Sequence, residues 1–105
     1  MRTYNISITE EAMQEEQALF RYLCEEVHAP LTAKRYIAGL RAAIKKLERT
    51  AGSLAVDWKL TRQVGFTVRR TNYKNVAIVY SIEENNVYIH HIIPQKMVIF
   101  PIIQE

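Results

Sequence analysis

The spacing of apolar residues changes along the chain from a period of two to a helical period and back again. Residues 4–8 alternate apolar and polar side chains, which predicts a short strand with Tyr4, Ile6 and Ile8 on one face. Apolar residues then recur at helical spacing in two long stretches. The pattern predicts one helix from about Glu10 to about Val27 and a second from about Thr32 to about Thr50.

Local signals place the ends of these helices. Thr9 precedes the first apolar stripe and is expected to cap the first helix. Pro30 disfavours helix at the residue before it, so it separates the two helices. Thr32 is the expected cap of the second helix. A short connection between two amphipathic helices predicts an antiparallel helical hairpin.

The C-terminal part of the chain predicts three strands, and residues 51–65 are the least regular part. Trp58 lies in that irregular stretch and is expected to anchor the core, with a binding role as the alternative. Asn85 and Asn86 suit a tight turn because asparagine tolerates positive φ. The strands are expected over about Phe66–Thr71, Val76–Glu83 and Asn86–Ile93.

The order of elements is therefore strand, helix, helix, strand, strand, strand, in a single domain over residues 1–105. Neither helical stripe can be buried by the other alone, so both are expected to pack on the sheet. The middle strand, VAIVYSI, is apolar on both faces, as a central strand should be. The fold class is α+β, with a helical hairpin packed on a small, mainly antiparallel sheet.

Composition indicates the cellular compartment in which the protein is expected. The chain has 105 residues and one cysteine, Cys24, so it forms no intrachain disulfide and fits a reducing compartment. Its first residues lack the apolar segment of a signal peptide, and no apolar run approaches the length of a membrane span. A cytoplasmic protein without membrane contact is expected.

Charge is concentrated in the middle of the chain. Residues 34–74 carry eleven basic side chains against Glu48 and Asp57, although the whole chain has a net charge of only +3. Such a block suggests an anionic partner, either nucleic acid or an acidic protein segment. The alternative is that these side chains are simply solvated.

Most catalytic motifs are missing. The chain has no glycine-rich phosphate loop and no zinc-like spacing, so no metal or cofactor is expected. His90 and His91 are adjacent on a strand, which predicts that they point to opposite faces. One imidazole is a candidate general acid or base on a phosphodiester, with Arg69 or Arg70 stabilising the charge. The alternative is one exposed histidine and one held in a polar pocket.

The whole chain resembles the RelE/ParE superfamily of bacterial toxins from type II toxin–antitoxin, or plasmid stabilisation, systems. The resemblance rests on the order of elements, on the length, and on Arg69 followed by the turn Lys74–Asn75 and the run VAIVY, which ends in Tyr80. A hairpin and a last strand, NNVYIHHII, follow as in that family. The resemblance covers residues 4–97.

The resemblance implies a toxin that binds a cellular target such as DNA gyrase and is neutralised by a cognate antitoxin. A ribosome-dependent mRNA endoribonuclease is the alternative, and a non-toxic remnant or small DNA-binding domain comes last. His91 stands where many members have an arginine, and Ala77 stands where the nuclease branch has one, which favours the gyrase branch. A homodimer or a heterotetramer with the antitoxin is the implied assembly.

The candidate site residues divide into two sets. The candidate catalytic residues are Arg69, His91 and His90. The candidate residues for binding nucleic acid or the target are Arg70, Lys74, Arg62, Lys59 and Lys96.

Overall fold

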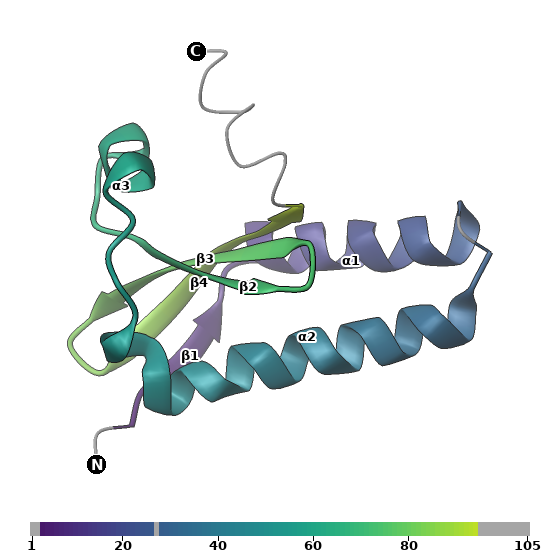
Figure 1. Ribbon diagram of the computed structural model, residues 1–105, viewed down its shortest axis with the longest axis horizontal. Coiled ribbons are helices and arrows are strands. Elements are labelled where there is room, and N and C mark those ends of the chain that lie inside the picture. Colours follow the sequence, from purple (N-terminus) through teal and green to yellow (C-terminus); the bar gives the residue numbers. More distant parts are fainter. Residues whose placement is uncertain (1–2, 27, 95–105) are drawn as a thin grey trace.

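The computed structural model describes residues 3–26 and 28–94, and its elements follow the predicted order with one addition (Figure 1). The predicted α+β fold is confirmed. The added element is a short helix between the helical hairpin and the last three strands. The elements are β1 (Asn5–Ile8), α1 (Glu10–Glu25), α2 (Pro30–Thr50), the 3₁₀ turn η1 (Ala51–Ser53), α3 (Trp58–Val64), β2 (Arg69–Tyr73), β3 (Val76–Glu83) and β4 (Asn86–Pro94).

The four strands form one sheet in the order β1-β4-β3-β2. The last three strands pair as an antiparallel meander, whereas β1 pairs in parallel with β4. Asn5 lies opposite Asn86 and Ile8 lies opposite Ile89, so within residues 3–26 and 28–94 the first strand is paired with the last. The sheet is mainly antiparallel, as predicted.

The helical hairpin covers one face of the sheet, and α3 lies over the other (Figure 1). On the first face, Leu40, Ile44 and Leu47 of α2 pack with Ile78 and other buried strand residues. On the second face, Leu60 of α3 packs with a smaller set that consists of Val68, Ala77 and Val79. Residues 76–80 of β3 are all buried, which confirms the prediction of a central strand.

The predicted helix starts are half correct. Thr9 caps α1, since its Oγ1 accepts a hydrogen bond from the Ala12 amide at 3.2 Å. The prediction for Thr32 is wrong: α2 begins two residues earlier, with Pro30 in its first turn and no side-chain cap. Proline is well suited to that position because its fixed φ is helical and its missing amide hydrogen would have no partner there.

Residues 51–65 are more regular than predicted. Asp57 caps α3, since its carboxylate accepts a hydrogen bond from the Leu60 amide at 3.0 Å. Gly65 ends the helix with a φ of 90°, a conformation that glycine adopts without strain. The prediction that Trp58 anchors the core is wrong, because its side chain is 63% exposed.

The tip of the β2–β3 hairpin is held against α2. The hydroxyl of Tyr36 donates a hydrogen bond to Asn75 Oδ1 at 2.7 Å, and the rings of Tyr36 and Tyr73 meet edge to face at 5.2 Å. The Tyr73 hydroxyl lies where a Cβ at residue 39 would be, so Gly39 allows this close approach. The hairpin and the second helix therefore form one unit.

Candidate functional site

A β-bulge brings the two histidines together, which corrects the prediction from strand alternation. Val79 pairs with His91 while Tyr80 pairs with Ile89, so His90 is the extra residue of β4. The side chains of Ile89 and Ile92 are buried on the hairpin side of the sheet. Both histidines line one hollow on the side of α3, so they do not point to opposite faces.

His91 is held by a carboxylate from the first helix. Its Nδ1 lies 3.3 Å from Glu15 Oε2, and Glu15 Oε1 accepts a hydrogen bond from the Ile92 amide at 3.0 Å. This hydrogen bond to Glu15 raises the pKa of His91 above its ordinary value, with part of the effect opposed by burial. Glu15 therefore ties α1 to the part of β4 that extends beyond its pairing with β1.

His90 has a different environment. Its Nε2 lies 2.7 Å from Ser81 Oγ, and its ring contacts Phe66 edge to face at 5.0 Å. Burial, assisted by the neighbouring His91, lowers the pKa of His90. The hollow beside the two rings has a volume of about 350 Å³, and Thr9 and Glu11 form part of its wall.

The opposite pKa shifts of the two histidines predict opposite effects on stability as the pH changes. His91 has a raised pKa, so its stabilisation is complete below its unfolded pKa of about 6.5 and is lost as the pH rises through the folded value. His90 has a lowered pKa, so it destabilises the fold as the pH falls from about 6.5 through its folded value. Relative to the native chain, His91→Gln should lose stability in acid, and His90→Gln should gain it.

Urea unfolding of the three proteins at about pH 8.5 and about pH 5.5 measures this difference. The upper pH lies further above the ordinary histidine pKa of about 6.5 and serves as the reference condition. If the free energy of unfolding changed by the same amount between the two pH values in the native chain and in both variants, the environments assigned to His90 and His91 would be contradicted.

Arg69 lies on the other face of the sheet, where its guanidinium binds backbone carbonyls. Its Nη1 donates hydrogen bonds to the carbonyl oxygens of Ala51 at 3.2 Å, Gly52 at 2.9 Å and Leu54 at 3.0 Å. Tyr80 lies opposite Arg69 in the sheet and donates to the Ala51 carbonyl at 2.9 Å. Burial raises the pKa of Tyr80 to about 12, so the phenol stays neutral. The structure thus does not bring Arg69 together with the histidines.

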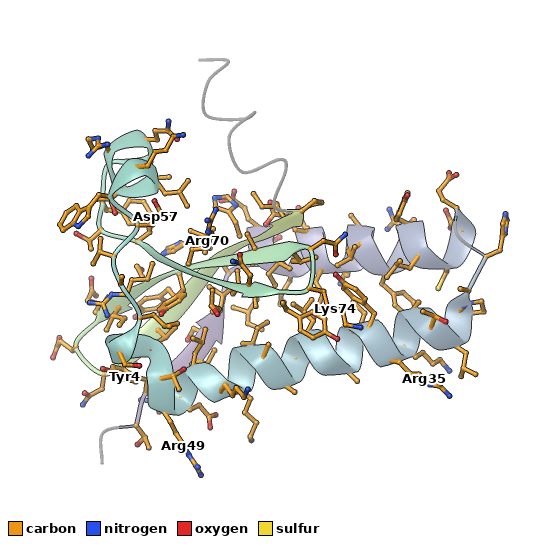
Figure 2. All side chains as sticks on the ribbon, in the orientation of Figure 1. Tyr4, Arg35, Arg49, Asp57, Arg70 and Lys74 are labelled. Carbon is orange, nitrogen blue, oxygen red and sulfur yellow. The ribbon has the colours of Figure 1, made fainter. Side chains whose placement is uncertain are left out.

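The other predicted site residues are spread over three places (Figure 2). Arg70 lies near the base of α3, where its Nε is 3.8 Å from Asp57 Oδ2. Lys74 is at the hairpin tip, with its Nζ 5.6 Å from the centre of the Tyr36 ring. The remaining two described residues, Lys59 and Arg62, are exposed on α3. Lys96 lies outside the described residues.

The basic block is divided rather than gathered into one site. Arg35 and Arg49 point away from the sheet on α2, whereas Arg70 lies on the opposite side of the molecule near α3 (Figure 2). The run of positive charge in the sequence therefore becomes two separate surfaces.

A groove between α1 and α2 is a feature that the sequence analysis missed. It has a volume of about 580 Å³, and Phe20, Cys24 and Ile37 contribute to its walls. Glu16 and Arg41 close one side through two hydrogen bonds of 2.5 Å, with Glu16 only 6% exposed. Glu16 lies one helical turn from the buried Ala12, and that spacing was the available signal that it faces inward.

Two negative findings apply to the residues that the structure describes. Among residues 3–26 and 28–94, no three His, Cys, Asp or Glu side chains are arranged to hold a metal ion. Over the same ranges, no helix has the length and apolar character to span a membrane.

The fold and its groove define a small α+β protein in which a helical hairpin on a four-stranded sheet offers an open apolar surface. The sequence model of the ParE toxin of the type II toxin–antitoxin system parDE matches residues 6–99. The chain therefore belongs to the ParE toxin family of type II toxin–antitoxin systems.

The fold is also that of a solved relative. A chain in the structure described as the chromosomal ParDE toxin–antitoxin system from P. aeruginosa superposes with a TM-score of 0.74 and 14% identity. The match covers 88% of this chain and 96% of that one. No curated protein sequence matches the chain significantly.

Proposed function

We propose that this toxin arrests growth in the cytoplasm by binding a cellular target such as DNA gyrase, and that a cognate antitoxin neutralises it by occupying the groove between α1 and α2. The observation that carries the proposal is this groove, whose walls include Phe20, Cys24 and Ile37. Concave sites with a volume of about 300–1,000 Å³ and mainly apolar walls are typical of binding sites.

The shape of the groove suits an amphipathic segment of a partner protein. Its long walls are two antiparallel helices, and an apolar helix face or extended segment fits such a channel. Other large apolar side chains are exposed on the same hairpin, namely Met13 and Tyr22 on α1 and Leu31 on α2. A partner lying along the hairpin would bury them as well.

Of the two arginines that a nuclease could use, Arg69 is removed by its position, whereas Arg70 lies on the histidine face. Arg70 pairs with Val79, and Val79 pairs with His91. A phosphodiester transition state needs a cation beside the acid–base group. Arg69 instead donates to three carbonyls on the face opposite the histidines. The ribosome-dependent endoribonuclease remains the second candidate because His90 and His91 share one hollow and have pKa values shifted in opposite directions.

Three assays on the full-length chain test the proposal. Induced expression should arrest bacterial growth, and co-expression of the small protein encoded beside its gene should relieve the arrest. The purified toxin should inhibit supercoiling by DNA gyrase. Cleavage of mRNA on translating ribosomes, lost in a His90→Ala, His91→Ala double variant, would contradict gyrase as the target and favour the nuclease.

A single charge in the groove should separate toxicity from neutralisation. Phe20→Glu places a carboxylate on the apolar wall beside Glu16, so antitoxin affinity should fall by about tenfold or more. Growth arrest should persist and should no longer be relieved by the antitoxin. Gln14→Glu on the exposed side of α1 adds the same charge outside the groove and is the matched control. Full relief of the Phe20→Glu toxin would exclude the groove as the antitoxin site.

A further inference from the structure

Trp58, at the start of α3, is a large apolar side chain that the fold leaves in water. It is 63% exposed, although it is the only tryptophan of the chain. The inward-facing residues of α3 are Leu60 and Val64, which pack on the second face of the sheet. The core therefore does not require the indole ring, and its exposure calls for another explanation.

The helix that carries Trp58 is held rigidly. The Asp57 amide donates to the Val68 carbonyl at 3.0 Å, and the Val68 amide donates to Thr61 Oγ1 at 3.0 Å. With the Asp57 cap and the turn at Gly65, these bonds fix both ends of the seven-residue helix. A side chain on a rigid element loses little backbone entropy on binding, which favours a contact residue.

Two cations accompany the ring. A helix turns by about 100° per residue, so Trp58 and Arg62 lie on the side of α3 away from Leu60, with Lys59 on the flank beside Arg62. Lys59 and Arg62 are both exposed, and within the described part of the chain neither forms a salt bridge.

The segment of the chain around α3 carries few acidic side chains, and Glu11 of α1 lines the hollow beside Val64. Asp57 is the only acidic residue between positions 51 and 82. Its carboxylate already accepts from the Leu60 amide and lies 3.8 Å from Arg70. The outer side of α3 therefore combines one indole with two exposed cations.

We propose that Trp58, Lys59 and Arg62 form the surface by which this toxin contacts its cellular target, and that the target offers an apolar pocket bordered by carboxylates. Tryptophan and arginine are the residues most enriched at the energetic centres of protein interfaces. The inference rests on the proposed toxin function and names the side of the molecule that carries it. The groove between α1 and α2 lies across the sheet from α3, so target and antitoxin take separate surfaces.

Other kinds of partner suit this surface less well. Single-stranded nucleic acid is bound by successive stacked bases along a basic track. The outer side of α3 offers one indole and two cations. A membrane surface is bound by an amphipathic helix with a broad apolar face, whereas α3 has seven residues and turns one large apolar side chain outward. An acidic protein surface with one deep pocket matches the three side chains.

Growth arrest on induced expression tests the proposal. Compared with the native toxin, Trp58→Ala and the double variant Lys59→Glu, Arg62→Glu should need about tenfold or more protein for equal arrest. Both should copurify with the antitoxin as the native chain does and should unfold at the native temperature, because the altered side chains are exposed. A matched control should arrest growth like the native chain: Lys45→Glu, Lys46→Glu makes the same change of net charge on α2.

Several results would overturn the inference. Native potency of the α3 variants, or an equal loss in the Lys45, Lys46 variant, would show that α3 has no special part in toxicity. Loss of antitoxin copurification with retained toxicity would assign α3 to the antitoxin. A blue shift of Trp58 fluorescence with a single-stranded oligonucleotide or with anionic vesicles would assign it to those partners. If the native chain failed to arrest growth, the proposed toxin function itself would be refuted. This outcome is distinguishable from failure of the α3 proposal because it is seen without any variant.

Discussion

Replacement of Arg69 by methionine is expected to lower the free energy of unfolding by about 3 kcal/mol. Methionine keeps most of the aliphatic volume but removes the donor that serves three carbonyls at the end of α2 and in the following turn. Net contributions of hydrogen bonds to charged groups are about 1.5–3 kcal/mol each. Because one nitrogen is shared among the three acceptors, the total should stay near the value for one strong bond. Chemical denaturation of the purified variant measures the loss.

Arg70→Met is the matched control for this experiment. Arg70 is the next residue of β2, and it lies in a 3.8 Å ion pair with Asp57 on a partly exposed surface. Such pairs contribute about 0–1 kcal/mol, so this variant should unfold close to the native chain. Equal losses for the two variants would mean that the Arg69 guanidinium has no special structural role.

Arg41→Met is expected to cost about 3 kcal/mol, for a different reason. Glu16 is 6% exposed, and Arg41 supplies the hydrogen bonds that satisfy its carboxylate. Removing the arginine leaves a buried charge without a partner, and breaking such a pair costs about 3–5 kcal/mol. The Arg41 side chain is 53% exposed, so water can replace part of the lost interaction and the lower end of that range applies.

A double variant isolates the cause. Glu16→Gln with Arg41→Met removes the buried charge together with its partner, so it should be more stable than Arg41→Met alone by about 1–2 kcal/mol. Arg21→Met also changes the wall of the groove, but it lies outside the Glu16–Arg41 pair and should have little effect. If the double variant were the less stable of the two, the Glu16–Arg41 contact would not explain the loss.

The elements that the sequence predicted well are those whose signals are local. Thr9 caps α1 because its side chain reaches an amide three residues away. The central strand Val76–Glu83 was recognisable because burial on both faces requires an unbroken apolar run. Both features depend on neighbouring residues, which are visible in one sequence.

The features that were missed depend on tertiary partners. The bulge at His90 arises from the register between β3 and β4, and no residue type within β4 indicates it in the sequence. Strand alternation therefore placed the two histidines on opposite faces. The role of Arg69 likewise depends on a chain reversal that brings residues 51–54 beside β2. A single sequence does not show how these segments meet.

The short helix α3 was not predicted from the sequence for a third reason. Only Leu60 and Val64 of its seven residues face inward, which is too few for a helical period to be recognised. Asp57 and Gly65 marked its two ends, but Trp58 between them suggested a core position instead. The exposed tryptophan misled the prediction of structure, and the same exposure now marks a candidate contact surface.

The parallel pairing of β1 with β4 has a consequence for synthesis of the protein. Asn5–Ile8 can acquire its partner only after Asn86–Ile89 has been translated, so a nascent chain cannot complete this sheet until β4 has emerged. A stop codon anywhere before codon 86 would leave the first strand with an open edge and remove β4 from the centre of the sheet. Products truncated before this point should therefore be substrates for proteolysis, and the folded toxin can form only after β4 has been translated.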